Sequence, residues 1–253
     1  MSTEGSSIDL AGLRRTVAVA CRILAHAGLA ADVLGHVSVR TGPETLLVRC
    51  RGPHERGLLY TEPSDVHEVG LDGALAAADY AVPQELPIHT RALARHPEAA
   101  AVVHAHPPAV VAADLAGLGL PPLVGAYNIP AARLAAGGIP VYPRGVLIRR
   151  AALADEMLAA MGDRPVCVLR GHGITAVGAS VAEAVVRALA VDDLARMVCR
   201  VAELGGTPRP LPDADLAELP DLGAAFNVDV VWRHHEQRLG TAGLLPADRE
   251  GGA

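Results

Sequence analysis

Three histidines in two short motifs have the type and spacing needed to bind a divalent metal ion. His104 and His106 end the apolar run 99–104, and residues two apart on a strand point to the same face. Imidazole is the commonest ligand of zinc and related ions. His172 lies between two glycines, which let a backbone approach a metal site closely. It can complete a three-histidine set with open positions for substrate.

Glu85 precedes the histidine pair on a predicted helix over residues 84–95, and His89 follows four residues later. Residues at this spacing share a helix face. Glu85 could be a fourth ligand, a general base beside the metal, or both in turn. An acid at a helix N-terminus is also stabilised by the helix dipole alone. For His89 we favour a histidine that packs or forms hydrogen bonds over a metal ligand.

The elements that must position these residues alternate between helical and extended patterns. The predicted helices cover residues 8–28, 84–95, 107–115, 151–161, 181–204 and 227–239. The predicted strands cover residues 33–39, 45–50, 58–61, 66–71, 99–104, 138–141 and 166–170, and Gly/Pro-rich loops occupy the rest of 117–146. We expect one α/β domain over residues 8–240, a disordered N-terminus at 1–7 and a flexible tail at 241–253.

Composition excludes several classes of function. The chain has a net charge of −6, no basic run and only 2 % aromatic residues, which argues against nucleic acid as a partner. All 22 basic residues are arginine. Without lysine the chain can form neither a Schiff base nor a pyridoxal-phosphate attachment, so a carbanion made here would need another stabiliser, for which a metal is the obvious candidate.

The cysteines and the apolar segments indicate a cytoplasmic protein. The four cysteines are far apart and form no Cys-x-x-Cys pair, as expected in a reducing compartment. The N-terminus has no signal-peptide pattern, and the long apolar stretches contain charges or prolines. We therefore expect no membrane association.

Taken together, the motifs resemble the class II aldolase/adducin family over roughly residues 10–205. The resemblance rests on Glu85-x3-His89, His96-Pro97, the apolar run into His104-Ala-His106, Arg170-Gly-His172-Gly, and Gly35-His36-Val37-Ser38, which is similar to the family's early Gly-Asn-x-Ser motif. It implies a single-domain three-layer sandwich, in which helices flank a mixed central sheet of about nine strands. It also implies a homotetramer with active sites at subunit interfaces.

The resemblance further implies which residues form the site. By it, His104, His106 and His172 are the metal ligands and Glu85 is the fourth ligand or the acid–base residue. Zinc is the preferred ion, and manganese, iron or cobalt would also suit three histidines.

The chain departs from the sugar-phosphate members of the family where those proteins bind phosphate. His36 replaces their asparagine, and Pro83-Gln84 replaces the Ser-Ser pair before the glutamate. Proline has neither an N–H nor a hydroxyl to offer a phosphate. We therefore expect a substrate without phosphate, for which Ser38 is a candidate contact.

Arginines near two turns favour a carboxylic acid as substrate. Arg51 and Arg56 lie in a Gly/Pro-rich turn, and Arg144 follows Pro140-Val-Tyr-Pro. Guanidinium groups bind planar carboxylates in a two-pronged geometry. The pattern is similar to the branch of the family that decarboxylates dihydroxyphthalate-type aromatic acids and ring-cleavage products. A solvated turn and a surface arginine are the alternative interpretations.

These observations predict a metal-dependent lyase that decarboxylates a hydroxylated aromatic or ring-cleavage acid through a metal-stabilised enolate. Glu85, His36 or Tyr127 would deliver the proton, Tyr127 because the family often supplies a tyrosine across the subunit interface from this loop. One alternative is a class II aldolase or epimerase acting on a sugar or hydroxy acid. Others are a non-catalytic adducin-like module and a binding protein with a structural metal, but structural zinc is usually four-coordinate and closed.

Overall fold

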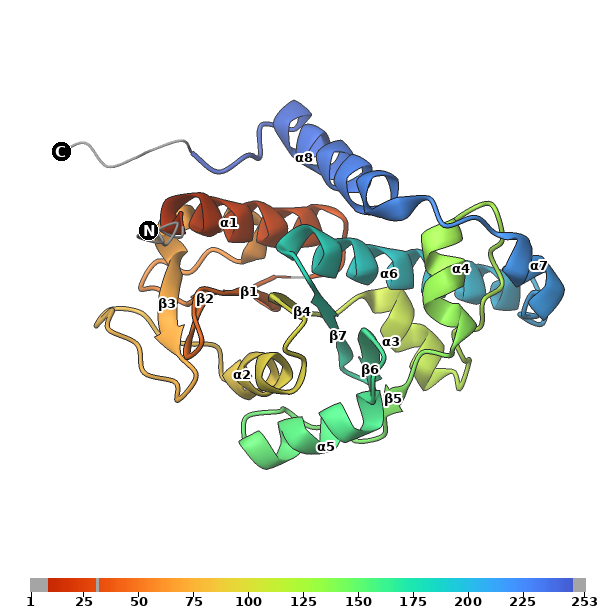
Figure 1. Ribbon diagram of the computed structural model, residues 1–253, viewed down its shortest axis with the longest axis horizontal. Helices are drawn as coiled ribbons and strands as arrows, with labels where there is room; N and C mark the ends of the chain where they lie inside the picture. The colour runs from red at the N-terminus through yellow and green to blue at the C-terminus, as the bar shows by residue number, and fades with distance from the viewer. Residues whose placement is uncertain (1–8, 31, 248–253) are drawn as a thin grey trace, which may run out of the picture.

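The computed structural model describes residues 9–30 and 32–247, and there a seven-stranded mixed sheet carries helices on both faces (Figure 1). The strand order is β3-β2-β1-β4-β7-β6-β5, and every pair is antiparallel except β5 with β6. The strands are β1 (His36–Arg40), β2 (Thr45–Arg49), β3 (Val66–Gly70), β4 (Ala101–Ala105), β5 (Val141–Tyr142), β6 (Val166–Leu169) and β7 (Gly173–Gly178). The predicted disordered segment 1–7 and residues 248–253 of the predicted tail lie outside the described residues.

Helices form a layer on each side of the sheet, as predicted for a three-layer α/β sandwich. One layer contains α1 (Leu10–His26) and α6 (Val181–Glu203), with α8 (Val231–Thr241) outside them. The other contains α2 (Leu86–Arg95) and α5 (Ala151–Met161). The shorter helices α3 (Pro108–Leu115) and α4 (Ile129–Ala136) pack on α6, and α7 (Asp213–Glu218) packs on α4.

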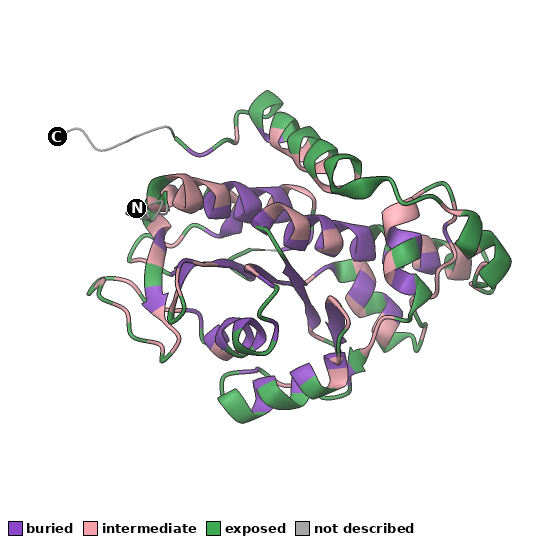
Figure 2. Cartoon of the chain, in the orientation of Figure 1, coloured by how far each residue is buried: buried purple, intermediate pink, exposed green. Residues whose placement is uncertain are grey.

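Two apolar cores fill the spaces between these layers, and β4 contributes to both. Ala101, Val103 and Ala105 point to the core beneath α1 and α6, whereas Val102 belongs to the core beneath α2 and α5. His104 shares the face of Val102, because alternate strand residues share a face. Buried positions concentrate in the sheet and on the inward helix faces, while α7 and α8 are largely exposed (Figure 2). The histidine motif therefore ends on the α2 side.

The structure corrects the sequence-based prediction in several segments. The strand predicted at 58–61 is wrong: Leu58–Tyr60 is a 3-10 helix whose hydrogen bonds are local, from Tyr60 N to Gly57 O and from Thr61 N to Leu58 O. Strand β7 was not predicted, because its short sequence is bounded by glycines directly after the Gly-His-Gly turn. The region predicted as loops also contains α4, and α7 lies where no helix or strand was predicted. The described sheet has seven strands where the resemblance implied nine.

Residues after α8 contact α1. Arg22, a buried residue of α1, donates hydrogen bonds to the backbone O of Leu244 (2.9 Å) and Thr61 (2.8 Å). The domain limits 8–240 stay a prediction. In the described part of the chain, no helix is both long and apolar enough to cross a membrane.

Candidate metal centre

His104 lies in the middle of the sheet, and one of its ring nitrogens is already hydrogen-bonded to the backbone. In the strand register it lies opposite His36 of β1 on one side and Thr175 of β7 on the other, and it is fully buried. Its Nδ1–H donates to the backbone O of Ile174 (3.0 Å). Because the carbonyl can only accept, the neutral ring keeps its lone pair on Nε2. That nitrogen lies 2.8 Å from His106 Nε2.

Two glycines allow the turn between β6 and β7 to bring His172 to the same place. Gly171 has φ +58°, in the left-handed region that favours glycine. A Cβ on Gly173 would collide with the backbone O of Ala105 and lie 3.0 Å from His106 Cδ2. With glycine at both positions, the ring centroid of His172 lies 4.8 Å from that of His106 and 4.9 Å from that of His104.

Glu85 completes the cluster from the start of α2. Its Oε1 accepts a hydrogen bond from the backbone N–H of Ile148 (2.9 Å), and its Oε2 lies 3.2 Å from His104 Nε2 and 3.6 Å from His172 Nε2. One potential ligand atom from each of Glu85, His104, His106 and His172 lies within 4.8 Å of all the others. In the described residues no other set of three or more His, Cys, Asp or Glu side chains has this geometry.

The charge states of the cluster suit a cation. Burial raises the pKa of Glu85, but the adjacent side chains of His104 and His172 outweigh it and hold that pKa well below its usual range. Burial, together with His104 and His172, lowers the pKa of His106 to about 3. The cluster thus combines a carboxylate with a neutral imidazole, and deprotonated groups of this kind are what a divalent metal requires. The residues present fit such an ion.

A second group of polar side chains lies directly beside the cluster. His36 stacks on His104 with ring centroids 4.9 Å apart, and its Nδ1 lies 2.7 Å from His89 Nε2. The other nitrogen of His89, Nδ1, lies 2.7 Å from Ser38 Oγ. Ser38 and His89 are completely buried, and His36 is 7 % exposed. His89 is thus a hydrogen-bonded residue of α2, the interpretation that its spacing favoured.

The predicted arginines and tyrosine lie at the surface. Arg51 is exposed and donates to the backbone O of Val33 (3.4 Å). Arg56 is exposed and lines a hollow of about 380 Å³ together with Arg49 and Tyr80. Arg144 is exposed and pairs with Glu156 of α5 (2.5 Å).

Tyr127, before α4, is 78 % exposed. In the described part of the chain, no hydrogen bond or ion pair joins Tyr127 or these arginines to Glu85 or to the three clustered histidines.

Two backbone features of the site were not predicted. The Ile148 N–H orients Glu85 from a loop 63 residues away, and no side-chain pattern in the sequence signals a backbone donor. Gly35 has φ +90°, and a Cβ there would lie 3.2 Å from the backbone O of His104. The glycine before His36 was the available signal, because a side chain there would press on β4 next to the Glu/His cluster.

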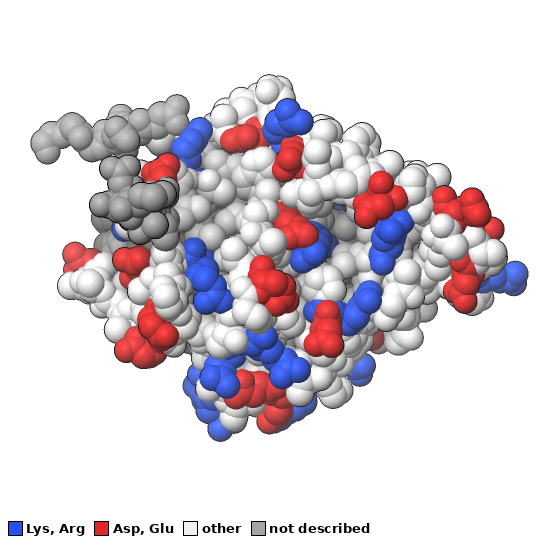
Figure 3. Space-filling view, viewed as in Figure 1, with Lys and Arg blue, Asp and Glu red and all other residues white. Residues whose placement is uncertain are grey.

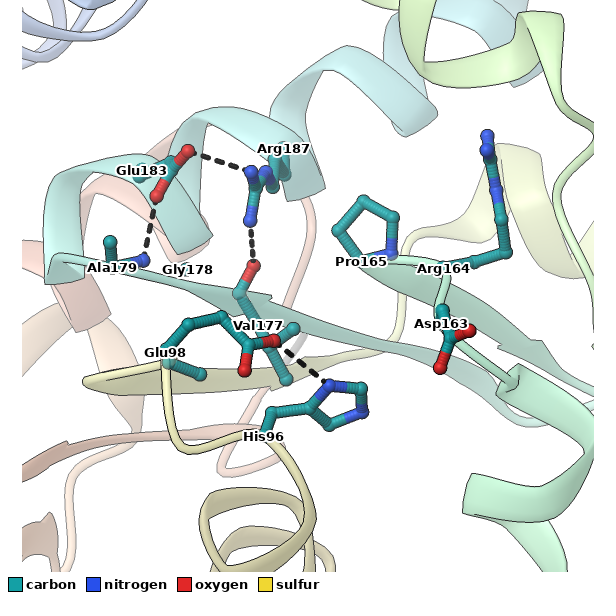
Figure 4. Close-up of a pocket in the computed structure, with 11 residues that line it drawn as sticks. His96, Glu98, Asp163, Arg164, Pro165, Val177, Gly178, Ala179, Glu183 and Arg187 are labelled. Atoms are coloured by element: carbon teal, nitrogen blue, oxygen red, sulfur yellow. Dashed lines mark hydrogen bonds and ion pairs between the residues drawn. The ribbon is translucent and has the colours of Figure 1, made fainter.

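Another hollow, of about 310 Å³, lies at the opposite end of β4 (Figure 4). Several of its polar side chains interact with one another: Glu183 forms an ion pair with Arg187 (2.7 Å), and His96 Nδ1 lies 3.1 Å from Glu98. No predicted site residue lines it. On the face in Figure 3, acidic and basic side chains are interspersed.

The chain belongs to the class II aldolase and adducin family. Residues 15–199 match the family model described as Class II Aldolase and Adducin N-terminal domain. Within this family, the chain is 56 % identical over 247 residues to a 3,4-dihydroxyphthalate decarboxylase of Arthrobacter keyseri, covering 96 % of this chain and all of that one. It is 50 % identical to a protein of the same name from Rhodococcus jostii (strain RHA1), over 92 % of this chain and 98 % of that one.

A solved structure with the same fold is an L-fuculose 1-phosphate aldolase from Glaciozyma antarctica PI12. It superposes with a TM-score of 0.77 over 98 % of this chain and 96 % of its own, at 18 % identity. The likeness confirms the predicted class II aldolase-like fold.

Proposed function

We propose that this protein is a metal-dependent carbon–carbon lyase that removes a carboxyl group from a hydroxylated aromatic acid of the 3,4-dihydroxyphthalate type. The observation that carries the proposal is the convergence of Glu85, His104, His106 and His172 within 4.8 Å. The substrate in this proposal is supported by the sequence, because the chain is 50–58 % identical to decarboxylases named for that substrate.

In this proposal His104, His106 and His172 hold the ion, and Glu85 is a fourth ligand or the acid–base residue. A divalent ion there would act as a Lewis acid and stabilise negative charge that develops on a nearby substrate oxygen. Zinc is the preferred ion, with manganese, iron and cobalt as alternatives that three histidines also accept. The remaining chemistry falls to the residues of the chain.

The substrate class sets the proton transfers. In a 3,4-dihydroxyphthalate, one carboxylate stands next to a ring carbon that bears a hydroxyl. When the C–C bond to that carboxylate breaks and CO2 leaves, the electron pair stays on the ring and a C–H bond must form. Glu85, a carboxylate here, takes the hydroxyl proton and delivers it to the ring carbon, and the phenolate oxygen that this leaves takes a proton from water as the product is released. His36 and Tyr127 are the other predicted proton donors.

The arginines recognise the carboxylates. Arg51 and Arg56 orient the remaining carboxylate in this proposal, because their guanidinium groups are exposed to an incoming anion. Arg144 is the third candidate, and to take part its guanidinium would have to leave Glu156.

The assembly and the location of the protein remain proposals. We propose a homotetramer with active sites at subunit interfaces, in which Tyr127 serves the site of a neighbour. Its 78 % exposure supports this, because a tyrosine so open in one chain is available to a partner. All four cysteines are unpaired, which supports the predicted cytoplasmic location.

The test is to measure the metal content of the purified protein and CO2 release from 3,4-dihydroxyphthalate. Unsubstituted phthalate, which lacks the neighbouring hydroxyl, is the matched control substrate. We expect one equivalent of metal per chain, and CO2 from the dihydroxy acid only. Aldehyde release from a sugar or hydroxy acid without CO2 release would indicate the aldolase alternative. Absence of bound metal would leave the adducin-like alternative.

A further inference from the structure

The geometry points to a role for Ser38 and His89 that neither the family model nor the relatives' names assign. We propose that these two residues fix His36 in the tautomer that carries its proton on Nε2, so that His36 is a hydrogen-bond donor to the substrate. The inference rests on the proposed lyase function for the identity of the substrate. The tautomer itself does not depend on that function.

The starting point is a chain of two short hydrogen bonds among three buried side chains. Ser38 Oγ lies 2.7 Å from His89 Nδ1, and His89 Nε2 lies 2.7 Å from His36 Nδ1. Burial, with further contributions from His89 and His104, holds the pKa of His36 well below its ordinary value. Burial and His104 lower the pKa of His89 to about 3. A hydrogen bond between two ring nitrogens needs one donor and one acceptor, so the protons along these two hydrogen bonds can run in either of two directions.

The hydroxyl of Ser38 decides between them. If Ser38 donates to His89 Nδ1, then His89 Nε2–H donates to His36 Nδ1, and the proton of His36 must be on Nε2. In the reverse arrangement His89 donates to Ser38 Oγ. The hydroxyl hydrogen of Ser38 would then need another acceptor, and none is found among the described residues. Ser38 is 0 % exposed, and an unmet donor at such a position is expensive. The first arrangement is therefore favoured.

The free nitrogen of His36 is placed to use this proton. His36 lies directly opposite His104 in the ladder of β1 and β4, and the two rings stack. Its Nε2 has no hydrogen-bond partner among the described residues. This atom is not among the completely buried polar atoms that lack a partner, so it is not sealed inside the protein. An Nε2–H beside the Glu/His cluster can therefore donate to a substrate oxygen on which charge develops.

The hydrogen bonds from Ser38 through His89 to His36 also exclude one role for His36, that of the proton donor. A neutral His36 that gave up its Nε2 proton would become an imidazolate, unless it took a proton through His89 from the hydroxyl of Ser38, which would then become an alkoxide. Such an alkoxide in a fully buried position is far too unfavourable. His36 therefore orients and stabilises the substrate, while Glu85 carries the transferred proton. Ser38 and His89 act through His36 and are positioning residues.

The first test measures the tautomer directly. The protein is labelled with ¹⁵N-histidine and loaded with Zn²⁺, and long-range ¹H–¹⁵N correlations give the protonated nitrogen of each ring. The His36→Gln variant identifies the His36 signals by their loss. We expect the Nε2–H form for His36 in the parent protein, and a mixture of forms in Ser38→Ala. An Nδ1–H form in the parent would overturn the proposal, whatever the activity.

The second test separates positioning from simple structural support. Ser38→Ala should lower kcat/KM for CO2 release about 10-fold, the usual effect of one hydrogen bond, with most of it in kcat. In the His36→Gln background the same substitution should have no further effect, because Ser38 acts through His36. Ser38→Thr, which keeps the hydroxyl, should restore both activity and tautomer. A 10-fold loss in both backgrounds, or no rescue by threonine, would contradict the proposal.

The two tests also keep this inference apart from the proposed function. If the parent protein releases no CO2, the lyase proposal fails, but the tautomer measurement still decides the arrangement of Ser38, His89 and His36. If the parent releases CO2 and His36 carries its proton on Nδ1, the positioning role fails and the lyase proposal stands.

Discussion

Two substitutions of Glu85 should separate its role in the metal site from its role in the fold. In Glu85→Gln, an amide oxygen can still accept from the Ile148 N–H, and the amide NH2 can donate to His104 Nε2, which lies 3.2 Å from Oε2. We therefore expect the metal-free variant to lie within about 1 kcal/mol of the parent in free energy of unfolding. Because the charge is lost, metal affinity should fall by at least about 100-fold, and CO2 release should be abolished.

Glu85→Ala should behave differently. It leaves the Ile148 N–H without an acceptor next to a cavity in a 5 % exposed site. The loss should be about 2–4 kcal/mol of stability. For a chain of this size, that corresponds to a fall of about 4–16 °C in Tm.

The assays for this pair are thermal unfolding with a chelator present, calorimetric titration with Zn²⁺, and CO2 release. Each variant is compared with the parent in the same buffer. A glutamine variant with an unchanged Kd for Zn²⁺ and unchanged turnover would refute both roles of Glu85 at the metal. Equal Tm values for the alanine and glutamine variants would refute the structural role of the bond to Ile148.

Three further outcomes follow from the geometry. His104→Ala should lose the bound metal and, since His104 is fully buried, also lower the free energy of unfolding by about 2–4 kcal/mol, measurable by urea unfolding without metal. Chelation of the metal from parent protein should lower stability by about 2.7 kcal/mol when the free ion had been at 100 times its Kd, and Glu85→Gln should not show this fall. Arg56→Ala should raise KM for the dihydroxy acid about 10-fold in steady-state assays, whereas Arg91→Ala, which breaks an exposed ion pair with Asp155, should leave KM unchanged.

Alternating helical and extended patterns allowed an α/β domain to be predicted, and the family resemblance implied its three layers. The clustered histidines were predicted from residue type and spacing. His104 and His106 had to share a strand face, and the glycines around His172 marked a close approach of the backbone. Strand β7 left a weak signal, because six residues bounded by Gly173 and Gly178 resemble a loop. The contact of Ile148 with Glu85 left none, because a backbone N–H is the same for every residue but proline.

His89 shows why spacing alone could not assign the second group of polar residues. Its place four residues after Glu85 predicted a shared helix face, and hydrogen bonding was one of the roles considered for it. Its partners, however, come from β1, about 50 residues earlier in the chain. Only the packing of α2 on the sheet determines that His89 meets Ser38 and His36.

The register of three neighbouring strands is what joins the two groups into one site. His36 lies opposite His104, and His104 lies opposite Thr175, one residue past the Ile174 carbonyl that fixes its tautomer. Side chains alternate between the two faces of a sheet, so a slip of one residue in β1 would turn His36 and Ser38 toward α1 and α6, away from His104 and His89. Val37 and Val39 of β1 pack in the core beneath α1 and α6 and would leave it, so their burial opposes such a slip. The apolar cores therefore hold the stacked histidines in place at the edge of the Glu/His cluster.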